Sequence, residues 1–242
     1  MVNPRTVLVT GSRGAIGRVV TGALRADGHR VRGLDRKPGT HADDLVGDLD
    51  NVAALRRACA GTQVILHFAA TPDVADFVSE LVPNNVAGPW NLLAAAVAEN
   101  VPRVLLASSC RVVHGRTWQG VLRVDDPVAP PDGYGLTKEF GERMGAFFAR
   151  RHGIAVIAAR IGFFCRDQRE FAVAGSSARA LYLSWEDCAR FASAVVAATW
   201  VGYHTVFVVG ADGGALYDLD PGRRLLGWEP RDVHPQGTPL SA

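Results

Sequence analysis

Short apolar runs alternate with longer helical patterns through the first two thirds of the chain. The runs have the length and composition of strands, and the segments between them carry apolar residues at helical spacing. The five predicted strands cover residues 6–11, 30–35, 63–70, 103–109 and 154–162. No hairpin signal separates them, so crossover connections should make a parallel sheet covered by helices on both faces. The sequence therefore predicts a doubly wound α/β fold.

The helical segments predict the layers that cover this sheet. They span residues 17–28, 51–61, 84–100 and 138–153, and several stop at a glycine or asparagine, as helix C-terminal caps do. Beyond residue 162 the pattern is looser, with a predicted helix over 185–199, a strand over 204–210 and a short helix over 218–230. This tail is too short for a domain of its own. We therefore expect one domain over residues 1–242, in which residues 163–242 form a small lobe that covers the substrate.

Composition excludes several classes of protein. The 242 residues are 48% hydrophobic with a formal net charge of only +2, and neither a long basic block nor an apolar run of membrane-spanning length occurs. The first residues enter a strand directly, unlike a secretory signal. Four scattered cysteines favour a reducing compartment: Cys59, Cys110, Cys165 and Cys188. Cys110 and His114 lie four apart without a second ligand pair, so no metal site is expected. These features predict a cytoplasmic protein that binds neither nucleic acid nor membrane.

A glycine-rich turn, "TGSRGAIGR", follows the first predicted strand and opens the first helix. Backbone without Cβ turns tightly and lets a pyrophosphate approach the positive N-terminal end of the helix. The position of the turn between strand and helix makes it a candidate dinucleotide-binding segment. Its residues are Gly11, Ser12, Arg13, Gly14, Ala15, Ile16 and Gly17.

The acid that ends the second predicted strand bears on the choice of cofactor. Asp35 should accept hydrogen bonds from the adenosine ribose and repel a 2′-phosphate, which favours NAD over NADP. Arg13 and Arg36 argue the other way, since either could reach a 2′-phosphate, so NADP stays possible. Asp48, with Leu49 beside it, offers a second acid for the adenine edge or is a solvated loop residue.

Three side chains suggest proton chemistry beside this cofactor. Tyr134 and Lys138 lie four residues apart at the start of a predicted helix, hence on one face. A free phenol has a pKa of about 10, but an adjacent ammonium and a positive nicotinamide both favour phenolate. Ser109 ends a predicted strand whose carboxyl end faces the ligand crevice. The set predicts alcohol oxidation by hydride transfer, with Tyr134 as base, Ser109 holding the substrate oxygen and Lys138 also binding the nicotinamide ribose.

The segments "TGSRGAIG", "HFAA", "NN", "ASS", "YGLTK" and "RIG", in this order, resemble the extended short-chain dehydrogenase/reductase family, also labelled NAD-dependent epimerase/dehydratase. The resemblance runs over residues 5–230. The short tail, the tyrosine segment and "LS..D" look most like the uronate dehydrogenases, which oxidise C1 of a hexuronic acid with NAD. It implies a Rossmann-like fold, an oxidoreductase acting on a sugar acid or similar polyol, and a homodimer formed through the Tyr134 helix and the helix near Asn85.

The resemblance also implies further site residues. Phe68, Ala69 and Ala70 would line the nicotinamide side. Asn85 would buttress the region of the 103–109 strand, and Ile161 would touch the carboxamide. The residues expected on the substrate side are Ser109, Thr71, Cys110, Arg111, Phe163 and Arg179.

Several of these substrate positions depart from the family's pattern. Cys110 and Arg111 stand where uronate dehydrogenases carry an asparagine and a histidine, and Phe163 replaces a small polar residue. Counting back from "VHG" puts Cys110 at the serine position, whereas counting from the start of the strand puts Ser109 there. Arg179 is the candidate for binding a substrate carboxylate, followed by Arg169 and Arg111.

Other functions are compatible with the same residues. A sugar epimerase or dehydratase would reduce and reoxidise its NAD without releasing it, although such enzymes usually carry a longer carboxyl-terminal lobe. A secondary-metabolism reductase with a non-uronate substrate fits the altered pocket. A non-catalytic NAD(P) sensor would commonly lose the tyrosine or the lysine, and both are present here.

Overall fold

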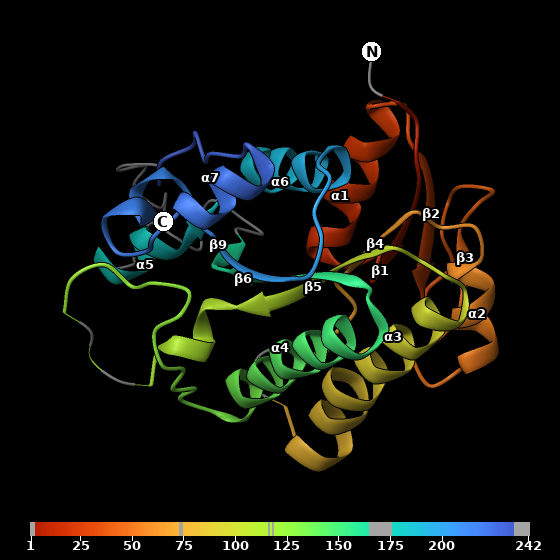
Figure 1. The fold of residues 1–242 in the computed structure, drawn as a ribbon, viewed down its shortest axis with the longest axis horizontal. Helices are drawn as coiled ribbons and strands as arrows, with labels where there is room; N and C mark the ends of the chain where they lie inside the picture. The colour runs from red at the N-terminus through yellow and green to blue at the C-terminus, as the bar shows by residue number, and fades with distance from the viewer. Residues whose placement is uncertain (1–2, 73–74, 116, 118, 165–175, 235–242) are drawn as a thin grey trace, which may run out of the picture.

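A parallel sheet forms the centre of the computed structural model of this chain (Figure 1). The structure describes residues 3–72, 75–115, 117, 119–164 and 176–234. The strands lie in the order β3-β2-β1-β4-β5-β6-β9, and every neighbouring pair is parallel. They are β1 (Thr6–Thr10), β2 (Arg30–Asp35), β3 (Leu45–Val46), β4 (Val64–His67), β5 (Arg103–Ser109), β6 (Ala155–Ile161) and β9 (Tyr203–Val208). The predicted doubly wound α/β fold is confirmed.

Helices cover both faces of this sheet. They are α1 (Ala15–Ala26), α2 (Val52–Cys59), the π-helical segment η1 (Phe77–Ala87), α3 (Gly88–Ala98), the 3₁₀ turn η2 (Cys110–Val113), α4 (Gly133–His152), α5 (Ser176–Leu181), α6 (Trp185–Ala197), the 3₁₀ turn η4 (Ala211–Ala215) and α7 (Asp220–Leu226). Helices α1, α6 and α7 lie on one face, and α2, α3 and α4 lie on the other (Figure 1). Within the described part of the chain, no helix is long and apolar enough to cross a membrane.

The strand and helix boundaries follow the sequence patterns closely. Strands β2 and β5 have the predicted bounds, and β1 and β6 lose only terminal residues. Strand β4 covers only Val64–His67 of the predicted 63–70, and β9 runs over Tyr203–Val208 instead of 204–210. Left-handed backbone follows four helices at the residues that the capping signals indicated: Gly28, Gly61, Asn100 and Gly153 have φ of 86°, 68°, 56° and 71°. The sequence patterns did not indicate β3 or η1.

The carboxyl-terminal third only partly forms a separate layer. Strands β7 (Phe163–Phe164) and β8 (Tyr182–Leu183) make a second small parallel sheet, and α5 packs on η4. Helix α6 and strand β9 fall inside the predicted lobe, yet α6 packs on α1 and β9 pairs with β6. The material available for covering a substrate is therefore smaller than residues 163–242.

Candidate active site

The glycine turn forms a cradle in which side chains would not fit. Gly11 has φ +68°, and a Cβ on it would lie 2.7 Å from the nitrogen of Ala69. A Cβ on Gly17 would lie 2.0 Å from the carbonyl oxygen of Gly11, and one on Gly14 would lie 3.1 Å from the same atom. Helix α1 begins at Ala15 with no acidic side chain in its first turn. The backbone donors at this helix end are suited to a pyrophosphate.

Asp35 lies at the carboxyl end of β2, beside this cradle. Its Oδ2 accepts the N–H of Arg13 at 2.9 Å, and its Oδ1 accepts the N–H of Lys37 at 3.0 Å. The carboxylate is thus held against the glycine turn, where a ribose of a bound dinucleotide would lie. The side chain of Arg36 is exposed, and Ser12 is buried under the turn. The cradle and the fixed acid together fit NAD.

Asp48 and Leu49 lie after β3, and the structure separates their roles. Asp48 is half-buried, and its Oδ1 accepts the N–H of Leu49 at 2.7 Å. Leu49 is 6% exposed and packs in the core with α3, where its carbonyl accepts the amide of Asn91 at 3.0 Å. Of the two residues, the structure leaves only Asp48 with a side chain suited to a polar contact with the cofactor.

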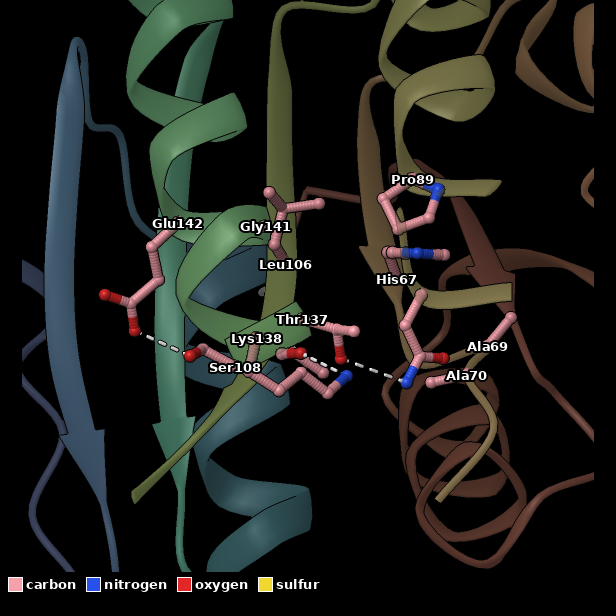
Figure 2. A pocket seen from close by; sticks show the side chains of 12 residues that line it. His67, Ala69, Ala70, Pro89, Leu106, Ser108, Thr137, Lys138, Gly141 and Glu142 are labelled. Carbon is pink, nitrogen blue, oxygen red and sulfur yellow. Dashed lines mark hydrogen bonds between the residues drawn. The ribbon is translucent and has the colours of Figure 1, made fainter. Parts of the chain in front are cut away.

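The exit of β4 contributes the next part of the crevice. Phe68 donates its N–H to the carbonyl of Thr10 at 3.2 Å, and Ala69 and Ala70 line a cavity (Figure 2). His67, which precedes them, is hydrogen-bonded through Nδ1 to Thr10 Oγ1 at 2.6 Å. Burial, with a smaller contribution from the charge of Lys138, lowers the pKa of His67 to about 3. His67 is therefore a neutral structural residue of this crevice.

Asn85 connects the segment after β4 to α4 through hydrogen bonds. Its Oδ1 accepts the N–H of Thr71 at 2.8 Å, and its Nδ2 donates to the carbonyl of Thr71 at 2.9 Å and to Thr137 Oγ1 at 3.3 Å. Asn84 donates to the hydroxyl of Thr71 at 2.8 Å. The amide of Asn85 thus joins the exit of β4 to α4. Asn85 also lines a cavity with Leu106 and Ser108 of β5, and its expected role beside the 103–109 strand stays a prediction. Thr71 is held in place by its hydrogen bonds with Asn84 and Asn85.

Tyr134 and Lys138 lie in the first turns of α4. Asp132 caps this helix by accepting the N–H of Gly135 at 2.7 Å. Lys138 Nζ lies 5.4 Å from the centroid of the Tyr134 ring. It also donates to the carbonyl of Ala107 at 2.9 Å, and Figure 2 shows Lys138 among the residues that line the cavity. Burial lowers the pKa of Lys138 to about 8, so the ammonium form still dominates at pH 7. The ammonium is thus placed against the phenol ring, at the end of β5.

The serine and the cysteine at the end of β5 point in different directions. Ser109 is half-buried, and its Oγ accepts the N–H of Arg111 at 3.2 Å. Cys110 is 2% exposed in a hydrophobic cluster, and its Sγ donates to the carbonyl of Arg160 at 3.2 Å. Burial raises the pKa of this thiol well above its usual range. Cys110 is thereby turned into the core, and the geometry leaves Ser109 as the hydroxyl of this edge. Ile161 pairs with Ser109 in the sheet.

Comparison with known proteins decides the family. The family model for the NAD dependent epimerase/dehydratase family matches residues 7–164. The chain belongs to this family. The predictions of this family, of its NAD dependence and of an enzyme of the short-chain dehydrogenase type are thereby confirmed.

Its relatives include several sugar dehydrogenases. An L-arabinose 1-dehydrogenase (NAD(P)(+)) of Haloferax volcanii is 30% identical, over 93% of this chain and 96% of the relative. A uronate dehydrogenase of Pseudomonas syringae is 28% identical, over 88% of this chain and 77% of the relative. A solved tyrosine-to-alanine mutant of uronate dehydrogenase from Agrobacterium tumefaciens, complexed with NAD, is 25% identical with a TM-score of 0.82, over 99% of this chain and 94% of that one.

The other expected substrate residues that the structure describes lie on three different elements, and none of them lines the cavity of Figure 2. Arg111 forms an ion pair with Asp132. Phe163 is 49% exposed in β7, where it pairs with Tyr182 of β8. Arg179 is exposed on α5. Cys165 and Arg169 lie outside the described residues. The structure therefore brings Ser109, Tyr134 and Lys138 to one edge of the sheet, with Arg111 beside them.

Sequence reasoning missed a buried charge cluster under the site. Glu142 Oε1 accepts from Ser108 Oγ at 2.6 Å and from Arg160 Nε at 2.9 Å, and its Oε2 accepts from Arg160 Nη2 at 2.9 Å. Glu142 and Ser108 line the same cavity as Lys138 (Figure 2). The sequence did contain a signal for this cluster: Glu142 lies one helical turn after Lys138, on the side of the predicted helix that packs on the sheet.

Proposed function

We propose that this protein is an NAD-dependent dehydrogenase that oxidises the CH–OH group at C1 of a sugar, with uronate-like sugar acids as the first candidates. The observation that carries the proposal is the placement of Lys138 Nζ against the Tyr134 ring at the end of β5. The names of the relatives support a sugar substrate, and they include both a neutral sugar and uronates.

The proposed reaction divides its steps among three side chains. Tyr134 accepts the proton of the substrate hydroxyl, and the ammonium of Lys138 favours the phenolate that this requires. The N–H of Arg111 occupies a lone pair of Ser109 Oγ, which leaves the serine hydroxyl to donate to the substrate oxygen. When bound, NAD would supply the hydride acceptor: the carbon that carries the hydroxyl would lose its hydrogen as hydride, the O–H proton would pass to Tyr134, and the alcohol would become a carbonyl.

The glycine turn, Asp35 and residues 68–70 would hold the cofactor. The position of the Asp35 carboxylate beside Arg13 supports NAD over NADP, because a 2′-phosphate at the ribose would meet a negative charge. We also propose a cytoplasmic location, supported by buried free thiols at Cys59, Cys110 and Cys188.

The test is cofactor reduction by purified protein. Glucuronate, galacturonate and L-arabinose are each supplied with NAD or NADP, and reduced cofactor is followed by absorbance. We expect turnover with NAD and a fall in kcat of about 100-fold to 10,000-fold in Tyr134→Phe, since the phenol is the proposed base. Undiminished activity in Tyr134→Phe would contradict the mechanism. NAD that stays bound without net reduction, while a sugar is epimerised, would assign the protein to the epimerases instead.

We further propose a homodimer formed through α3 and α4. Trp90 on α3 and Phe140 on α4 are 46% and 50% exposed, and Trp90 stacks on Phe147 with ring centroids 6.0 Å apart. Aromatic side chains exposed together on adjacent helices are typical of a subunit interface. A second copy presenting the same face would cover them by two-fold symmetry.

A further inference from the structure

A continuous chain of contacts joins the two hydroxyls of the proposed site. The N–H of Arg111 donates to Ser109 Oγ at 3.2 Å, and the guanidinium of Arg111 pairs with Asp132 Oδ2. The other oxygen of Asp132 accepts the N–H of Gly135 at 2.7 Å. Gly135 is the neighbour of Tyr134 in the chain. One ion pair therefore lies between the residue that holds Ser109 and the residue that caps the helix of Tyr134.

Backbone contacts bring the same two segments close together. The N–H of Ala129 donates to the carbonyl of Val112 at 2.8 Å, just before α4. A Cβ on Gly135 would lie 3.3 Å from the carbonyl oxygen of Arg111. The 3₁₀ turn η2 is thus seated on the start of α4. Small shifts of the Arg111–Asp132 pair would therefore be transmitted directly to the first turn of this helix.

We infer that Arg111 and Asp132 are a positioning pair that fixes the separation of Ser109 from Tyr134. The inference rests on the proposed function, in which both hydroxyls must reach one substrate oxygen. Ser109 lies at the end of β5, and Tyr134 lies in the first turn of α4. The hydrogen bonds of Lys138 to Ala107 and of Ser108 to Glu142 join this helix to the strand only beyond that turn. Misplacing a reacting group by about 1 Å can cost about 100-fold in rate. A modest ion pair at this junction can therefore matter more for the rate than for stability.

The same pair changes the role expected for Arg111 in substrate binding. Arg111 and Asp132 side chains are 40% and 34% exposed, and the charge of the guanidinium is compensated by the carboxylate. A substrate carboxylate would have to compete with Asp132 for it. Arg111 therefore acts through Ser109 and the helix of Tyr134, and recognition of a sugar acid does not depend on it.

The test compares Arg111→Met, Asp132→Asn and the double variant. Asn keeps a side-chain oxygen that can cap Gly135, so Asp132→Asn removes mainly the charge. We expect each single variant to lower kcat about 10-fold, with KM for sugar and for NAD changed less than about 3-fold. The double variant should be no slower than the slower single variant, because the two residues act as one unit. Arg111→Lys should recover part of the loss.

A matched control lies on the same helix. Arg143 is 73% exposed and pairs with Glu139 at 3.5 Å, so Arg143→Met removes an ion pair of α4 without touching the junction. We expect its kcat to equal that of the wild type. The inference is overturned if Arg111→Met raises KM for uronates while leaving L-arabinose unchanged, because that identifies a direct carboxylate contact. Additive losses in the double variant would overturn it as well.

A readout without turnover separates this inference from the proposed function. Hydrogen exchange is measured by mass spectrometry over residues 108–113 and 130–138 with NAD bound. Exchange should rise in both segments together in Arg111→Met and stay unchanged in Arg143→Met. Unchanged exchange in Arg111→Met overturns the positioning pair whether or not a substrate is known. Absence of turnover by the wild type with coupled exchange would instead overturn the proposed function.

Discussion

At the scale of single residues, Lys138 combines a charge with a location that disfavours it. Burial lowers its pKa from 10.5 to about 8. Between pH 8 and pH 10.5 the unfolded chain binds a proton that the folded chain lacks, so stability rises with pH through this window. Below pH 8 the folded protein carries the full cost of the buried ammonium. The ammonium therefore lowers stability, whereas its position beside Tyr134 supports the proposed proton transfer.

Lys138→Met should therefore stabilise the protein and abolish its activity. We expect the free energy of unfolding at pH 7 to rise by about 2 kcal/mol, which is less than the full pKa difference implies because the side chain is not completely buried. The gain should shrink as pH rises from 8 to 10.5. Urea unfolding of both proteins at pH 7 and pH 10 measures this. A gain of equal size at both pH values would show that packing, not charge, is the cause.

At the scale of secondary-structure elements, the Glu142–Arg160 pair joins α4 to β6, the strand next to the edge strand β9. The two side chains are 7% and 3% exposed, and Arg160 Nη1 also donates to the carbonyl of Val124 at 3.2 Å. Glu142→Gln leaves a buried guanidinium without its charge partner and should lower the free energy of unfolding by about 3–5 kcal/mol. Denaturant titration measures the loss.

The double variant Glu142→Leu with Arg160→Met is the control for this prediction. Apolar side chains of similar size remove both charges, so most of the stability should return. If the double variant is as unstable as Glu142→Gln, the loss comes from packing and hydrogen bonds of Arg160 rather than from an unpaired charge. The double-variant cycle separates these contributions.

The elements also show what the sequence could and could not predict. Strand β5 was predicted to the residue, because its apolar run is bounded by a proline and by polar residues. Strand β3 has two residues, too few for any periodicity, and Pro83 interrupts the pattern of η1. The Glu142–Arg160 pair depends on the register of β5 against β6, which opposes Ser108 to Arg160. That register is a tertiary property.

The choice between Ser109 and Cys110 has the same origin. Neighbouring residues at a strand end point to opposite sides. The sequence therefore predicts that one of the two side chains faces the crevice and that the other faces the core. It does not show which side chain faces the core, because that depends on tertiary contacts: Cys110 is buried against Arg160 and in the cluster with Phe207 and Tyr217.

At the scale of the whole molecule, the exposed aromatic face of α3 and α4 is the surface through which the proposed homodimer would form. The large apolar side chains of α4 divide into two groups: Met144 and Phe148 are buried against the sheet, whereas Phe140 and Phe147 are exposed. The buried half serves the fold, and the exposed half supports the proposed homodimer.

Phe140→Glu should separate the proposed dimer into monomers. The two-fold axis would place two new carboxylates in one apolar interface, where an unpaired charge is costly, so we expect the dimer to weaken at least about 100-fold. Val201→Glu is the matched control, because Val201 is 77% exposed and precedes β9, outside α3 and α4. Light scattering after size exclusion gives the mass of each protein. A wild type that is monomeric at 100 times the concentration used for assay, or a Phe140→Glu variant that stays dimeric, would contradict an interface on this face.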